Sequence, residues 1–217
     1  MQLKAIGQQN LKQNKKNNKF IYLISPNKIK DESFYGNLAL VLNSGNVSFF
    51  QLRLKKETNQ NKLIIGKKIK KICKKFKVKF LINDDPLLAK KLNADGCHLG
   101  QKDMELIKAR KILKNKIIGV TCHNSINLAK RAIKAGADYL AFGAFYSSKT
   151  KIVKYKASLT ILKSAKKITS LPIVAIGGIK LNNYKKLLLN KANFLAISGY
   201  IWNNKKYKPL EAVKKLK

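Results

Sequence analysis

Eight short apolar runs, separated by segments of helical pattern, constrain the fold of this chain more than any other feature. The runs are rich in Ile, Val, Leu and Phe and lack a strict alternation with polar residues, which is typical of buried parallel strands. They lie at Phe20–Ser25, Val47–Leu52, Val78–Ile82, Gly96–Leu99, Ile117–Val120, Tyr139–Phe142, Ile173–Ile176 and Phe194–Ile197. We therefore expect eight strands, each followed by a helix.

The segments between the runs carry the helical signals. Apolar residues recur at helical spacing from Ile65 to Phe76, and Ser125 can cap a helix that Gly136 ends. Repeated strand–helix units form parallel sheets with right-handed crossovers. Eight such units predict the α/β class, as a single (β/α)8 TIM barrel. No GxGxxG loop follows the first run, which argues against an open doubly wound sheet.

We expect one catalytic domain over residues 20–217, preceded by a basic, polar segment at 1–19 that is partly disordered. No apolar stretch reaches the roughly 20 residues of a membrane helix. Cys73, Cys97 and Cys122 are too widely spaced for a zinc site and odd in number, which indicates free thiols and a cytoplasmic location.

The charge balance is strongly positive. Lys and Arg number 47 against 10 Asp and Glu, a formal net charge of +37. Such a field attracts phosphates and nucleic acid. The lysines are nevertheless spread over every expected helix, which favours solvated helix faces over a specific nucleic-acid surface.

Polar residues follow the second and third runs, where a barrel places its active site. In an extended chain Gln51, Arg53 and Lys55 share one face, and two buried cations call for an anion. At the next run we expect Asp84 to ligate a hard cation such as Mg²⁺, and Asp85 to cap the helix that starts at Pro86.

Polar or glycine residues also follow the later runs. Asp103 would either cap the next helix or supply a second carboxylate to the same metal. Hydroxyl and ammonium groups near Ser148 and Lys151 could cradle a phosphate. Glycines after the seventh and eighth runs, such as Gly178, let backbone N–H groups approach a ligand. Loops at this position bind phosphate in many TIM barrels.

These stretches resemble the thiamine phosphate synthase family, also called thiamine-phosphate pyrophosphorylase, which is related to TenI. The resemblance rests on QLRLK at 51–55, INDD at 82–85, ADGCHLGQKD at 94–103, GVTCH at 119–123, TK at 150–151 and AIGGI at 175–179. It implies a transferase that joins 4-amino-5-hydroxymethyl-2-methylpyrimidine diphosphate to 4-methyl-5-(2-phosphoethyl)thiazole. The products would be thiamine phosphate and diphosphate.

The resemblance also implies a role for each matching residue. Asp84 and Asp103 would bind Mg²⁺, and Gln51 would contact the pyrimidine. The groups implied to be catalytic and to hold the diphosphate are Arg53, Lys55, Asn83, Thr121 and Lys151. The groups implied to bind the thiazole phosphate are Ser148, Thr150, Gly178, Ile197 and Ser198. The only partners implied are the two small substrates, with no specific nucleic acid and no membrane; the oligomeric state is left open.

The chain departs from the family at Leu54 and Lys102, where acids are usual, and at Ser147 and Ser148, where Pro and Thr are usual. Two alternatives remain at this point. One is a TenI-like thiazole tautomerase, in which His123 would be the acid–base group. The other is a non-catalytic, basic nucleic-acid-binding barrel. Neither uses the carboxylates Asp84 and Asp103.

Overall fold

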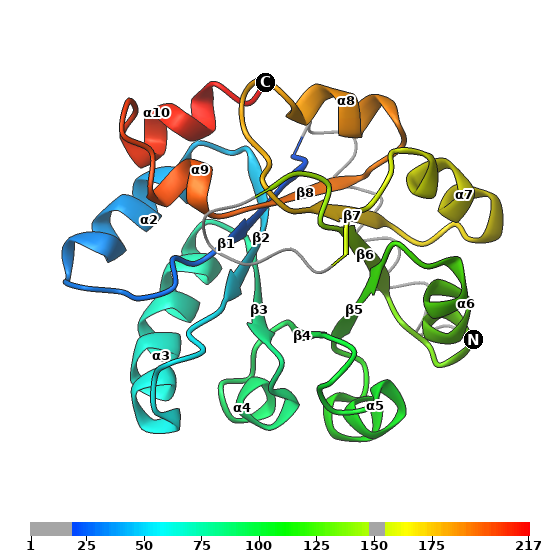
Figure 1. The fold of residues 1–217 in the computed structure, drawn as a ribbon. Helices are drawn as coiled ribbons and strands as arrows, with labels where there is room; N and C mark the ends of the chain where they lie inside the picture. Colours follow the sequence, from blue (N-terminus) through cyan, green and yellow to red (C-terminus); the bar gives the residue numbers. More distant parts are fainter. Residues whose placement is uncertain (1–18, 148–154) are drawn as a thin grey trace.

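A computed structural model describes residues 19–147 and 155–217. Its strands form a closed parallel barrel in the order β1-β2-β3-β4-β5-β6-β7-β8, and Figure 1 shows the helices arranged around them. The strands are β1 (Ile21–Ile24), β2 (Val47–Leu52), β3 (Lys79–Asn83), β4 (Gly96–Leu99), β5 (Ile117–His123), β6 (Tyr139–Gly143), β7 (Ile173–Ile176) and β8 (Phe194–Ile197). Every predicted strand is present, and the TIM barrel is confirmed.

The helices follow the strands in turn. They are α2 (Ser33–Asn43), α3 (Asn59–Lys75), α4 (Pro86–Lys91), α5 (Leu106–Leu113), α6 (Ile126–Lys134), α7 (Thr160–Ile168), α8 (Tyr184–Leu189), α9 (Gly199–Trp202) and α10 (Pro209–Lys214). In the described part of the chain, none of them is long and apolar enough to cross a membrane.

Two predicted helix caps are confirmed. The Asp85 carboxylate accepts a hydrogen bond from the backbone N–H of Leu88, and the Ser125 hydroxyl accepts one from Leu128. Gly136 follows α6 with a φ of +91°, a conformation in which a side chain would be strained. Side-chain caps thus fix where α4 and α6 begin, and the left-handed Gly136 marks the end of α6.

Apolar side chains form two layers because successive residues of a strand point to opposite faces. In β1, Ile21 and Leu23 pack outward against the helices, whereas Tyr22 and Ile24 belong to a separate cluster. That second cluster fills the barrel interior, and its largest rings are Tyr22, Phe49, Tyr139 and Phe194. The interior is therefore a packed core, and a ligand can enter only at the ends of the strands.

A repeated hydrogen bond from a side chain to the preceding strand secures the N-terminal ends of β4, β6 and β8. Asp95, Asp138 and Asn193 each precede β4, β6 or β8 by one residue. Their side chains accept the backbone N–H of Phe80, Ile118 and Ile173, respectively, at 2.9, 2.8 and 2.9 Å. We call these three residues the strand hooks. Two of the chain's ten acids are thus structural.

Candidate active site

The end of β2 delivers three polar side chains to the barrel mouth, as the alternation predicts. Leu52 and Leu54 are buried on the outer face, while Gln51 lies 2% exposed on the opposite face. Within the described residues, Nε2 of Gln51 has no hydrogen-bond partner. Arg53 donates through Nη1 to Oδ1 of Asn27 at 3.2 Å. A buried amide without a partner is costly, so Gln51 is suited to a polar ligand entering from above.

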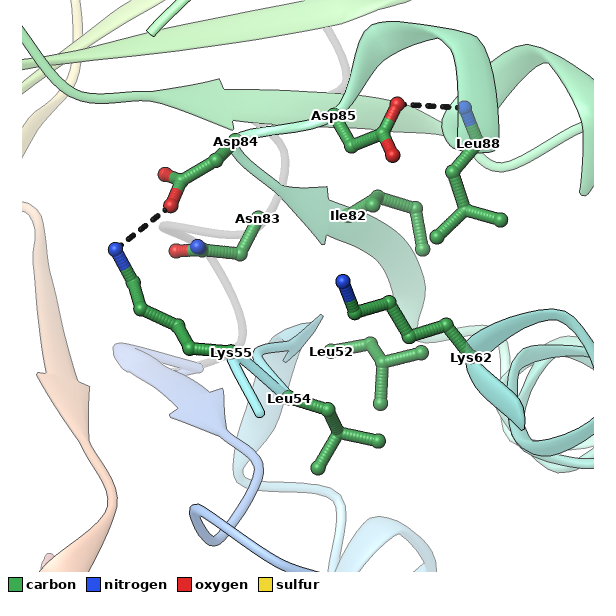
Figure 2. A pocket seen from close by; sticks show the side chains of 9 residues that line it. All are labelled: Leu52, Leu54, Lys55, Lys62, Ile82, Asn83, Asp84, Asp85 and Leu88. Carbon is green, nitrogen blue, oxygen red and sulfur yellow. Dashed lines mark hydrogen bonds and ion pairs between the residues drawn. The ribbon is translucent and has the colours of Figure 1, made fainter. Parts of the chain in front are cut away.

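Lys55 and Asp84 meet where β2 and β3 end. Nζ of Lys55 lies 2.9 Å from Oδ2 of Asp84, and Figure 2 shows the Asn83 amide directed into the space beside them. Asp84 has a φ of +64°, so its side chain leaves the strand at a turn. The strand end therefore places an amide, a carboxylate and an ammonium group around one point.

Asp84 and Asp103 form a carboxylate pair. Their side chains lie close enough for each to shift the pKa of the other. Burial opposes ionisation of Asp84, but hydrogen bonds from Lys55 and Asp103 outweigh it and lower its pKa. Burial and the adjacent Asp84 carboxylate raise the pKa of Asp103. The two neighbouring carboxyl groups thus differ in how readily they ionise, with Asp84 the stronger acid.

Asp103 does not cap the following helix, so that alternative from the sequence is wrong. Helix α5 begins three residues later, after Glu105. The Oδ2 atom of Asp103 instead accepts the backbone N–H of Gly100 at 2.7 Å. A Cβ at residue 100 would lie only 2.8 Å from this oxygen. The short β4–α5 turn therefore holds Asp103 against Asp84.

The carboxylate pair fits a hard divalent cation. Magnesium in proteins is commonly bound by one or two carboxylates, with water and substrate phosphates completing the octahedron. Among the described residues, no group of three or more His, Cys, Asp or Glu side chains could hold a metal. The protein thus offers only part of a coordination sphere, and a phosphate-bearing substrate would have to supply further ligands.

A small cleft adjoins this carboxylate site on the outer side of β2 and β3. Its volume is about 220 Å³. Figure 2 shows Leu54, Ile82 and Leu88 along its walls, with the Lys62 ammonium facing the cleft from α3. The cleft reaches the mouth at Asn83 and Asp84. Lys62 was not predicted from the sequence, because nothing in the pattern of this lysine-rich helix sets it apart.

Thr121 lies within β5, which extends three residues beyond the predicted end at Val120. Its Oγ1 lies 2.8 Å from Nε2 of the buried His98 on β4. The side-chain amide of Gln101 donates to the backbone carbonyl of the same threonine. Two residues on, the His123 ring packs against Tyr155 with ring centroids 4.4 Å apart. Thr121 is therefore held from both its side chain and its backbone.

The ends of β6 and β7 lie together. Gly178 has a φ of +58°, and a Cβ there would overlap the backbone oxygens of Tyr146 and Ser147. The close approach explains why glycine occupies this position. The expected phosphate ligands Ser148, Thr150 and Lys151 fall outside the described residues. Only the base of that loop can be placed, and it abuts Gly178.

Ser25 closes the ring of polar contacts between β8, β1 and β2. The Ser198 hydroxyl, next to Ile197 at the end of β8, donates to the carbonyl of Ser25 at 3.0 Å. The Ser25 hydroxyl in turn accepts the backbone N–H of Arg53 at 2.9 Å. Ser25 ends the first apolar run of the sequence, where nothing predicted a role for it. The described site residues thus come from strands all around one mouth.

Comparisons with known proteins agree with this arrangement. The family model described as thiamine monophosphate synthase matches residues 21–201. A curated thiamine-phosphate synthase from Pelagibacter ubique is 86% identical over 207 residues, which cover 95% of this chain and 100% of that protein. Another, from Nitrosomonas eutropha, is 41% identical and covers 84% of this chain and 86% of its own length.

Solved structures give the same result. Thiamine phosphate pyrophosphorylase from Pyrococcus furiosus superimposes with a TM-score of 0.80 at 26% identity, covering 92% of this chain and 94% of that one. The sequence matches span nearly all of the barrel and every described strand end discussed above. The chain belongs to the thiamine monophosphate synthase family.

Proposed function

We propose that this protein joins 4-amino-5-hydroxymethyl-2-methylpyrimidine diphosphate to 4-methyl-5-(2-phosphoethyl)thiazole, releasing diphosphate and forming thiamine phosphate. The observation that carries the proposal is the contact of Lys55, Asp84 and Asp103 at the barrel mouth. This group combines an ammonium cation with two carboxylates suited to Mg²⁺, and positive charge of this kind would stabilise a departing diphosphate. Family membership and the names of the curated relatives support the same reaction.

The chemistry divides between substrate and protein. The bond between the pyrimidine methylene carbon and the diphosphate oxygen breaks, and the aminopyrimidine stabilises the positive methylene by resonance. The thiazole nitrogen then supplies the electron pair for the new carbon–nitrogen bond. No protein nucleophile is needed, so the protein acts by positioning both substrates and by stabilising the charge of the leaving group.

The residues at the ends of β2 and β3 would receive the pyrimidine diphosphate. Arg53, Lys55, Asn83 and Lys151 would hold its diphosphate, with Thr121 as a hydroxyl donor. Asp84 and Asp103 would hold Mg²⁺, which when bound neutralises charge on the diphosphate. The unpartnered Gln51 amide would face the pyrimidine ring.

The other substrate would lie on the opposite side of the mouth. Its phosphate would bind the backbone at Gly178, Ile197 and Ser198, with hydroxyls from Ser148 and Thr150. The left-handed backbone of Gly178 supports this arrangement, because it leaves the approach free of a side chain. Location in the cytoplasm stays a prediction, supported by three buried free thiols among the described residues.

The tautomerase alternative explains less of the site. The substrate of a thiazole tautomerase carries one phosphate and no diphosphate, so that reaction gives the Lys55–Asp84–Asp103 group no role. His123, its expected acid–base residue, lies at the mouth with its ring against Tyr155. A His123→Gln variant should therefore retain much of the coupling activity. Loss of all activity in that variant, with full activity in Asp84→Asn, would favour the tautomerase.

The direct test is a coupling assay on the purified protein. We expect thiamine phosphate and diphosphate to appear together, in equal amounts, when both substrates and Mg²⁺ are present. Omission of either substrate should give no thiamine phosphate. Absence of product from the complete mixture, with the protein shown to be folded by circular dichroism, would refute the proposal.

A further inference from the structure

A chain of hydrogen bonds crosses the barrel interior and ends at Thr121. The Tyr22 hydroxyl on β1 lies 2.8 Å from the Tyr139 hydroxyl on β6. The Tyr139 hydroxyl lies 2.9 Å from Nδ1 of His98, whose Nε2 lies 2.8 Å from Oγ1 of Thr121. Three of the four residues are almost completely buried. Only Thr121, at the mouth, is partly exposed.

Gly119 makes room for this series of hydrogen bonds inside the barrel. Gly119 lies two residues before Thr121, on the same face of β5. A Cβ at Gly119 would overlap the Tyr139 ring, so only glycine lets that ring lie across the interior. The Tyr139 ring then stacks on His98, with 5.7 Å between ring centroids. The contact between these two residues is therefore built into the packing of β5.

The series of hydrogen bonds ends at Tyr22 inside the barrel, and this end determines which group of each pair is the donor. The only partner of the Tyr22 hydroxyl in the described structure is Tyr139. Burial raises the pKa of both tyrosines, so both keep their protons. If Tyr22 donates to Tyr139, then Tyr139 donates to Nδ1 of His98. The proton of the imidazole then resides on Nε2 and is donated to Thr121.

The opposite direction leaves a buried donor unsatisfied. In that case Thr121 donates to His98, His98 donates to Tyr139, and Tyr139 donates to Tyr22. The hydroxyl proton of Tyr22 then has no acceptor, and a buried donor without an acceptor is costly. A doubly protonated imidazole would donate to both hydroxyls, so it too would leave the proton of Thr121 free. The hydroxyl proton of Thr121 is used inside the barrel only when Thr121 donates to His98.

We propose that His98 and Tyr139 are positioning residues, which orient the hydroxyl of Thr121 so that its proton points out of the barrel and is donated to the diphosphate of the pyrimidine substrate. This role rests on the proposed function, because it assigns that diphosphate to the barrel mouth. A threonine that accepts from His98 can donate only outward, toward the charge that develops as the diphosphate leaves. Its bond to the substrate would thus strengthen during the reaction.

Two tyrosine variants test the direction of the chain. Tyr139→Phe removes the hydroxyl that donates to Nδ1 of His98. Nδ1 is then without a partner whether or not it carries the proton, so either imidazole tautomer becomes possible and Thr121 can turn inward. Tyr22→Phe removes one oxygen from the same core and leaves Nδ1 of His98 as the acceptor for Tyr139. Tyr139 therefore still donates to His98, and His98 still donates to Thr121. We expect kcat to fall about tenfold in Tyr139→Phe and less than about threefold in Tyr22→Phe, with KM for the thiazole phosphate unchanged in both.

A double-mutant cycle separates positioning from a structural role. If Tyr139 acts through the hydroxyl of Thr121, then adding Tyr139→Phe to Thr121→Val should change kcat by less than about twofold. Thermal unfolding of each variant monitors the fold independently. Equal losses in the two tyrosine variants, or additive effects in the cycle, would refute the positioning role while the wild type still makes thiamine phosphate. Failure of the wild type itself to couple the substrates would refute the proposed function instead.

Discussion

The backbone of Asp84 is left-handed, with a φ of +64°, and this shapes the choice of variant for the metal site. Asn tolerates this conformation better than Ala does. We therefore expect Asp84→Asn to fold normally, yet to lose about a hundredfold or more in turnover, because the carboxylate that would bind Mg²⁺ is gone.

Asp85→Asn is the matched control for this variant. It removes the neighbouring charge but keeps a side chain able to cap α4. Turnover in this control should stay near that of the wild type. Steady-state assays across Mg²⁺ concentrations measure both variants, and wild-type activity that survives EDTA would contradict the metal assignment.

The buried imidazole of His98 makes stability depend on pH. Burial lowers the pKa of His98 to about 4, below the value of about 6.5 expected in the unfolded chain. Its contribution is complete above pH 6.5 and is lost as pH falls toward 4, because the unfolded chain then binds the proton more readily. From pH 7 to pH 5 we expect a loss of about 2 kcal/mol in the free energy of unfolding from this group.

Urea unfolding at both pH values measures this loss. The carboxylates also titrate in this range, so His98→Gln serves as the reference. The wild type should lose about 2 kcal/mol more than His98→Gln between pH 7 and pH 5. Equal losses in the two proteins would show that the imidazole is not shielded from water in the folded state.

Much of the site could be predicted because its residues differ from their surroundings. Acids are scarce, so Asp84 and Asp103 stand out against the lysines. The roles of His98 and Tyr139 could not be foreseen, because they depend on which side chains face each other across a closed barrel. Tyr139 begins β6, whereas its hydroxyl reaches His98 near the end of β4.

At the scale of secondary-structure elements, the strand hooks explain where β4, β6 and β8 begin. Asp138 accepts the backbone N–H of Ile118 and also pairs with Arg110 at 2.6 Å. Asn193 makes the equivalent backbone hydrogen bond without a charge. The backbone hydrogen bond is thus common to Asp138 and Asn193, and the ion pair with Arg110 is an addition at Asp138.

Replacement of Asp138 should reveal these two contributions. Asp138→Ala leaves the N–H of Ile118 and the Arg110 guanidinium without this acceptor, so we expect a loss of about 2–3 kcal/mol in unfolding free energy. Asp138→Asn keeps the backbone hydrogen bond, as in Asn193, and should lose about 1 kcal/mol or less. Urea unfolding gives both values, and identical losses would show that the ion pair is the main contribution.

The elements themselves were predictable from apolar runs, and the differences occur where polar residues enter a strand. Strand β5 was expected to end at Val120, but it continues through Thr121 to His123. Thr121 and His123 are polar and only partly buried, so hydrophobicity does not indicate this extension, although Cys122 between them is buried in the core. The structural roles of Asp95 and Asp138 were not predicted either, because a carboxylate that accepts one backbone N–H has no distinctive spacing in the sequence.

At the scale of the whole molecule, the charge of +37 should produce weak binding to nucleic acid. Exposed lysines such as Lys67, Lys71 and Lys74 lie along α3, away from the carboxylate pair. Binding should fall steeply as salt rises, because it depends on the release of counterions. Lys→Glu at these three positions should weaken it, while Lys→Arg at the same positions should not.

Filter binding across salt concentrations, alongside the coupling assay, measures this effect. The Lys→Glu variant should retain most of its turnover, with some loss of substrate association rate because long-range attraction of anions weakens. Sequence-selective binding that persists at about 0.2 M salt would instead favour a dedicated nucleic-acid partner.

The strand hooks have a consequence for how this scaffold can change. They attach β4, β6 and β8 to their neighbours at the floor of the barrel, on the side away from the substrates. Strand register is thereby secured without help from the loops above. Those loops are free to lengthen, shorten or be exchanged between relatives, so new substrates can be accommodated by loop grafting while the frame beneath stays unaltered.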